Sequence, residues 1–102
     1  MLLEEANFKI PEKLQVRQIV ASYDDTYVIL YQVSSYQFEK NLYHLKGSGD
    51  VIKKYQFKDV VKSFSMLNDH KVAIFMIKEQ TILVVDLKNQ THKGVLIALT
   101  GK

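Results

Sequence analysis

Apolar side chains are distributed along this chain in short runs rather than at helical spacing. Residues 27–31 (YVILY) and 82–85 (ILVV) are rich in β-branched and aromatic side chains, and polar segments separate such runs. Runs of this length and composition are typical of β-strands, whereas an amphipathic helix would show a period of about 3.6 residues. The pattern therefore predicts an all-β protein.

Eight strands are expected, in two groups of four that form two antiparallel sheets. The predicted strands are 14–21, 26–33, 38–46 and 50–57, followed by 60–67, 71–77, 81–88 and 94–99. Polar turn sequences such as YDD, GSG and NDH lie between them. The expected organisation is a leader over residues 1–13, a first unit over 14–57 and a second unit over 58–102. Together the units form one structural domain or part of a larger one.

The two units align with each other. Shifting residues 16–31 by 45 positions places them on 61–76, and the aligned pairs include Arg17 with Lys62 and Asp24 with Asp69. Further along the chain the shift falls to 42. Four strands per roughly 40–50 residues is the spacing of the blades of a β-propeller.

The segment 82–88 (ILVVDLK) resembles the end of a WD-repeat blade, where a hydrophobic strand closes on Trp-Asp before a turn. Val85 stands at the tryptophan position, Tyr43-His44 occupies the dipeptide position of the first unit, and the opening Gly-His pair is missing from both units. The resemblance covers residues 14–99. It implies two divergent propeller blades and, as the commonest use of such repeats, a non-enzymatic scaffold for protein–protein interactions.

The burial pattern favours the same architecture. Residues 27–31, 72–77 and 82–85 do not alternate between apolar and polar, so both faces of these strands are expected to be buried. In a propeller each blade lies between two others, and the mixed strand 50–57 suits the outermost position. The alternatives are a small β-sandwich or barrel, or a pleckstrin-homology-like domain. The absence of an amphipathic helix from the final segment GVLIALTGK argues against the last of these.

Two blades cannot close a ring, because propellers typically need about four to eight. Two isolated blades would also leave open apolar faces and strand edges. We therefore expect additional blades from a longer chain, from three or four copies of this chain, or from a partner protein. The leader could add a strand to a neighbouring blade and close the ring.

Composition narrows the setting. The 102-residue chain contains no cysteine, which excludes disulfides and thiolate metal sites and favours a reducing compartment. Its first residues do not form a secretory signal, and no apolar run is long enough to span a membrane. The expected location is intracellular, in the cytoplasm. The net charge of +3 is too small to indicate nucleic-acid binding by itself.

No motif indicates catalysis, a metal or a cofactor, so we expect no enzymatic activity. The three histidines lack metal-ligand spacing and are expected on the surface: His44, His70 and His92. The Asp24-Asp25 and Asn68-Asp69 pairs suit tight turns that asparagine and aspartate side chains stabilise. Gly47-Ser48-Gly49 suits a hairpin turn rather than a phosphate loop, since no helix follows it.

Two surface features are candidates for binding. The connection SSYQFEKN contributes the aromatic residues Tyr36 and Phe38, and the region after it contributes a basic and aromatic set: Lys53, Lys54, Tyr55 and Lys58. The lysines could instead protect an edge strand against aggregation.

Two alternative functions remain open. One is a carbohydrate-binding propeller assembled from several chains, similar to small two-blade lectins, although the tryptophans of their sugar sites are absent here. The other is a basic β domain that binds nucleic acid or anionic lipid.

Overall fold

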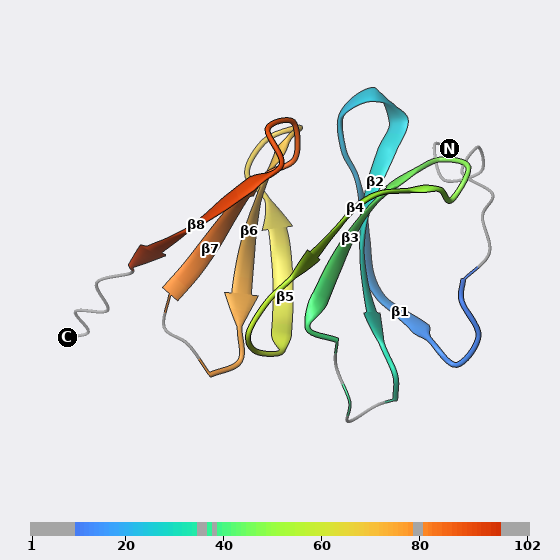
Figure 1. Ribbon diagram of the computed structural model, residues 1–102, viewed down its shortest axis with the longest axis horizontal. Helices are drawn as coiled ribbons and strands as arrows, with labels where there is room; N and C mark the ends of the chain where they lie inside the picture. Colours follow the sequence, from blue (N-terminus) through green and yellow to red (C-terminus); the bar gives the residue numbers. More distant parts are fainter. Residues whose placement is uncertain (1–9, 35–36, 38, 79–80, 97–102) are drawn as a thin grey trace.

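Eight strands form two four-stranded antiparallel sheets, which confirms the expected fold class (Figure 1). The computed structural model describes residues 10–34, 37, 39–78 and 81–96. The first sheet contains β1 (Gln15–Ala21), β2 (Thr26–Gln32), β3 (Asn41–Lys46) and β4 (Val51–Gln56); the second contains β5 (Val61–Met66), β6 (Lys71–Met76), β7 (Thr81–Asp86) and β8 (Thr91–Leu96). A short 3-10 helix, η2 (Tyr23–Asp25), precedes β2. In each sheet the strands lie in chain order, and the described strands close no barrel.

Two strands begin three residues away from the expected position, and the other strand starts agree within one residue. The strand predicted from Phe38 begins at Asn41, and the strand predicted from Gly94 begins at Thr91. In the second case the turn after Asp86 occupies only residues 87–90, so Thr91 already pairs with Asp86. The polar segment from Thr91 to Lys93 suggested a turn, but polar side chains are tolerated on the exposed edge strand that β8 forms.

The turns use the side chains that the sequence indicated. The Asn68 carboxamide oxygen accepts hydrogen bonds from the backbone N–H groups of His70 and Lys71 at 2.9 and 2.8 Å. Asp24 and Asp25 have φ values of 51° and 55°, a left-handed conformation that aspartate tolerates better than most residues. The Asn68 side chain therefore stabilises one tight turn, Asp24 and Asp25 lie in another, and Gly47-Ser48-Gly49 forms the expected β3–β4 hairpin turn.

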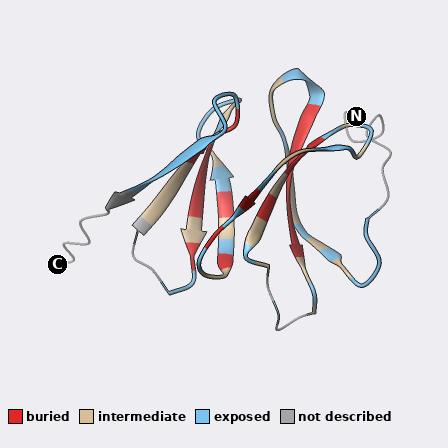
Figure 2. Cartoon of the chain, in the orientation of Figure 1, coloured by how far each residue is buried: buried red, intermediate tan, exposed pale blue. Residues whose placement is uncertain are grey.

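The main hydrophobic core lies between the two sheets. The first sheet and the connection after it contribute Val28, Leu30, Leu42, Tyr55 and Phe57; the second contributes Val61, Phe64, Val72, Ile74, Met76, Val85 and Leu87. Figure 2 shows that buried residues concentrate on the middle strands β2, β3 and β6, whereas β8 is largely exposed. Removal of these aliphatic and aromatic side chains from water stabilises the fold by about 1.5–3 kcal/mol per large side chain.

β2 is buried on both of its faces, as expected for residues 27–31. The face turned away from the second sheet carries Ile29 and Tyr31, which form a separate small cluster with Leu45. Partly buried neighbours pack against this cluster, and Tyr43 places its ring edge-on to Tyr31 at 5.2 Å. The first sheet thus has an apolar layer on each side.

The outward face of the second sheet is less covered than the sequence suggested. Ala73 is 5% exposed, but its neighbours on that face, Phe75, Ile82 and Val84, are only half-buried. The expectation of burial on both faces therefore holds fully for β2 and only partly for β6 and β7. Ala73, Phe75, Ile82 and Val84 together form a surface that we call the open face.

The two sheets share an irregularity at equivalent positions. β1 has a bulge at Arg17, where Val16 pairs with Tyr31 but Gln18 pairs with Leu30. β5 has the matching bulge at Lys62, between Val61 and Ser63. Arg17 and Lys62 are 45 positions apart. The shift of 45 that aligns the two units in sequence therefore also aligns the geometry of their first two strands.

This alignment shows how the sheets are stacked. Val28 and Leu30 face the second sheet, but their equivalents 45 positions later, Ala73 and Phe75, face away from the first sheet. A sandwich with two-fold symmetry would pack equivalent faces against each other. Here the second sheet repeats the orientation of the first, so the two are stacked in the same sense.

Candidate functional site

The side chain of Gln18 joins β1 and β5, which are edge strands of the two sheets. Its amide nitrogen donates to the Phe64 carbonyl at 2.6 Å, and its amide oxygen accepts from the Phe64 backbone N–H at 3.1 Å. One β1 side chain thus satisfies both backbone groups of a β5 residue. Two further hydrogen bonds extend the junction: Arg17 Nε donates to the Lys62 carbonyl, and the Tyr23 N–H donates to the Asp69 carbonyl.

The connection between the two sheets starts at the edge strand farthest from this junction and returns to the junction. β4 lies at the edge of the first sheet farthest from β1, yet β5, which follows it, lies beside β1. The connection is fixed by hydrogen bonds from the Phe57 N–H to the Lys40 carbonyl and from the Val61 N–H to the Glu39 carbonyl. Each sheet therefore starts with a strand at this junction, its inner edge (β1 or β5). It ends with the strand farthest from the junction, its outer edge (β4 or β8).

A buried polar network lies close to the inter-sheet core. His44 is 0% exposed, which corrects the expectation that it lies on the surface. Its Nε2 atom is 2.8 Å from Thr26 Oγ1, which is also 2.6 Å from Ser22 Oγ. Thr26 is far from His44 in sequence and becomes its neighbour only through the β2–β3 pairing, so the sequence contained no signal for this contact.

The hydrogen-bond geometry determines which nitrogen of His44 carries the proton. The Thr26 hydroxyl donates to the Tyr23 carbonyl, which can only accept, at 2.6 Å. The same hydroxyl must therefore accept from His44 Nε2, which makes His44 the Nε2–H tautomer. Its other nitrogen, Nδ1, is buried without a hydrogen-bond partner among the described residues. Ser22 Oγ lies 3.5 Å from the same Nε2 atom, which carries the proton in this tautomer and therefore does not accept one from the serine hydroxyl.

Burial also controls ionisation in this region. Burial lowers the pKa of His44 and raises the pKa of Tyr55 to about 12, with Tyr23 and Asp86 adding to the effect on Tyr55. The Tyr55 hydroxyl has no hydrogen-bond partner in the described part of the chain. Both side chains therefore remain neutral near pH 7, as their position in the core requires.

We expect this neutral histidine to make the stability depend on pH. Since the folded pKa of His44 lies below the unfolded value of about 6.5, the free energy of unfolding is highest above that pH. It decreases as the pH falls below it, by at most about 1.4 kcal/mol per pH unit. Urea denaturation at about pH 7.5 and about pH 5.5 measures the difference, which His44→Phe should largely remove.

The exposed residue His92 provides the control for this experiment: His92→Gln leaves His44 and its hydrogen bonds in place, so the difference caused by His44 should remain. Asp69 and Asp86 have lowered pKa values, owing first to the hydrogen bonds from the His70 side chain and from the Asn89 backbone, respectively. Their contributions are lost only below their unfolded pKa of about 4. A His44→Phe variant with the wild-type pH dependence would contradict the assignment.

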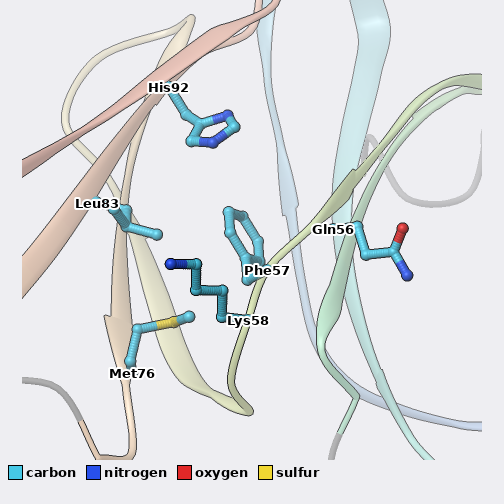
Figure 3. Close-up of a pocket in the computed structure, with 6 residues that line it drawn as sticks. All are labelled: Gln56, Phe57, Lys58, Met76, Leu83 and His92. Atoms are coloured by element: carbon cyan, nitrogen blue, oxygen red, sulfur yellow. The ribbon is translucent and has the colours of Figure 1, made fainter.

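A hollow opens where the two sheets diverge, next to the β4–β5 connection. It has a volume of about 380 Å³ and is lined by Gln56, Phe57, Lys58, Met76, Leu83 and His92. Figure 3 shows Phe57, Met76 and Leu83 around an apolar space, with the Lys58 amine directed between Leu83 and Met76. The His92 ring lies above Phe57, edge-on at 6.0 Å between ring centroids.

The absence of one side chain helps to create this hollow. Gly94 pairs with Leu83, on the side of β8 that also carries His92. With hydrogen at that position, Gly94 places no side chain over Leu83. The sequence identified Lys58 as a candidate binding residue but missed Met76, Leu83 and His92, because these belong to the other unit.

The predicted binding residues do not form one surface. Lys53 and Lys54 are neighbours in β4 and point to opposite faces of the sheet. Lys53 lies 5.6 Å from the ring centroid of Tyr55, whose ring is in the core, and Lys58 lies at the hollow. Tyr36 and Phe38 lie outside the described residues.

Neither a metal centre nor a membrane helix is present in the part of the chain that the structure describes. No three or more metal-binding side chains are grouped there, and none of its helices is long and apolar enough to cross a bilayer. Comparison of the chain with protein-family models, with curated proteins and with solved structures found no match.

Proposed function

We propose that the chain forms two consecutive blades of a β-propeller and acts as a non-enzymatic protein-interaction scaffold. Further blades, from a partner protein or from other copies of the chain, complete the ring. The observation that supports this function most strongly is the stacking of the two sheets in the same sense. A heterologous interface of this kind leaves the open face of the second sheet unused, and it propagates until the rotation closes a ring.

The chain crossing supports the same function. Each sheet runs from an inner to an outer edge strand, and the next sheet starts again at the inner edge beside its predecessor. This is the strand arrangement of successive propeller blades. The Gln18 junction holds neighbouring inner strands together, which is the position where blades meet around a central axis.

The open face is where the next blade would pack. Ala73 and Phe75 are equivalent to Val28 and Leu30, which in this chain already pack against a following sheet. Half-buried Ile82 and Val84 extend the same apolar surface. Exposed apolar surface on a sheet is typical of a protein–protein contact.

The test is Val84→Asp, measured by light scattering coupled to size-exclusion chromatography. We expect wild-type protein to form assemblies larger than a monomer, and Val84→Asp to be folded but monomeric because the charge would be desolvated by an incoming sheet. Leu67→Asp is the matched control, since Leu67 is 57% exposed in the β5–β6 turn and off the open face. A monomeric wild type that shares its mass with Val84→Asp over a wide concentration range would contradict assembly from copies. If Val84 stayed exposed to solvent in the complete assembly, the scaffold function as a whole would be contradicted.

A further inference from the structure

The hollow between the sheets has two chemically different sides. Its apolar part is formed by Phe57, Met76 and Leu83, of which the first two are buried. The Lys58 ammonium reaches into the same space and forms no ion pair with another described residue. His92 adds an exposed imidazole at the rim. A cation beside an apolar surface is matched by a ligand that joins a carboxylate to an apolar group.

Two physical effects make this match specific. Lys58 is exposed, but Phe57 and Met76 beside it are buried, so a carboxylate seated in the hollow would lose part of its hydration and be attracted to the ammonium more strongly than in bulk water. The volume of about 380 Å³ falls in the usual range of small-ligand sites and accommodates one aromatic or branched side chain. Acids without an apolar group would leave the buried part of the hollow empty.

We propose that this hollow binds a carboxylate attached to an aromatic or branched apolar group. The carboxylate pairs with Lys58, and the apolar group packs against Met76, Leu83 and Phe57. A free acid and the C-terminal residue of a peptide share this chemistry. The site is complete within this pair of sheets, so it does not depend on additional blades.

The experiment is a titration of the isotopically labelled full chain, followed by amide chemical shifts. The probes are N-acetyl-phenylalanine and its uncharged amide, and an N-acetylated tripeptide ending in phenylalanine with a free or an amidated C-terminus. We expect millimolar affinity for the acid and at least about tenfold weaker binding of the amide, since one charge-assisted hydrogen bond is lost. Shifts should concentrate at residues 56–58, at Met76 and along β7 and β8.

Three variants identify the site. Lys58→Met removes the charge and preserves the length of the side chain, and we expect it to weaken binding of the acid by about tenfold. Gly94→Leu places a side chain over Leu83 and should abolish binding; its backbone is in a strand conformation that leucine adopts. Lys54→Met is the control, because Lys54 is also an exposed lysine and lies on the face of β4 that points away from the second sheet.

The outcomes are distinguishable. Tighter binding of the free-terminus tripeptide than of the simple acid assigns the ligand to a partner's C-terminus, and equal binding assigns it to a free acid; both support the site. Equal binding of acid and amide, or wild-type affinity in folded Lys58→Met, overturns it. If Gly94→Leu does not fold, Lys58→Met alone decides. None of these results depends on the mass measured for the Val84→Asp test.

Discussion

Replacing Ile74 with aspartate is expected to abolish the folded state. Ile74 is fully buried in β6 and faces the first sheet. A carboxylate there would lose its hydration without gaining a cation, at a cost of several kcal/mol in addition to the lost apolar burial. A domain of this size has a total stability of about 5–15 kcal/mol, so one such change can exceed it. Circular dichroism with thermal unfolding should show no cooperative transition.

The matched control for this change is Ile77→Asp, three residues further along the chain. Ile77 is 47% exposed, so the same substitution leaves the new carboxylate in water. We expect its free energy of unfolding to change by less than about 1 kcal/mol. If Ile74→Asp unfolded at the wild-type temperature, the core could not lie between the two sheets.

Loss of the Gln18 side chain is expected to weaken the junction of the sheets. Gln18→Ala removes two hydrogen bonds and leaves the N–H and carbonyl of Phe64 without their side-chain partner in a partly buried position. Unsatisfied groups of this kind cost about 1–3 kcal/mol each, so we expect a total loss of about 2–4 kcal/mol. Chemical denaturation followed by circular dichroism measures this loss.

Gln32→Ala is the control for Gln18→Ala. The Gln32 side chain also hydrogen-bonds, to Gln15 and Arg17, but on the exposed surface of one sheet. We expect a loss below about 0.5 kcal/mol, because water replaces these partners. Equal effects of the two substitutions would show that Gln18 has no special role between the sheets.

A third variant, Gln18→Glu, separates the two hydrogen bonds of this junction. Its carboxylate can accept from the Phe64 N–H but cannot donate to the Phe64 carbonyl, and its charge would lie close to that carbonyl oxygen. Because the nearby carbonyl oxygen disfavours the charged form, the loss relative to wild type should diminish as the pH falls and be smallest below the usual glutamate pKa of about 4.3, where the new carboxyl group is protonated in both states.

The strands were predictable because their signals are local. Runs such as residues 27–31 combine β-propensity with burial, and the turn at Asn68 needs only its own neighbours. The start of β8 was predicted three residues too late, since a polar edge strand and a turn have the same composition. The 45-residue alignment was visible in sequence as well, although the two bulges that give it structural meaning were not.

The candidate sites were less predictable because they depend on pairs of distant residues. His44 was expected on the surface, and only the fold places Thr26 beside it. In the sequence, Gln18 is an ordinary polar residue of an alternating strand, and only the fold places β5 beside it. The hollow combines Lys58 from the connection with side chains of the second sheet, and no spacing rule connects those positions.

The chain-order pairing within each sheet has a consequence for biosynthesis. All strand pairs of the first sheet lie within β1–β4, so they can form before β5–β8 have been translated. Contacts between neighbours in sequence form fastest, and translation proceeds at about 5–20 residues per second, far slower than hairpin closure. The nascent first sheet would then keep its Val28 face uncovered until β5–β8 have been translated. During that interval of a few seconds, the chain is most exposed to chaperones and to aggregation.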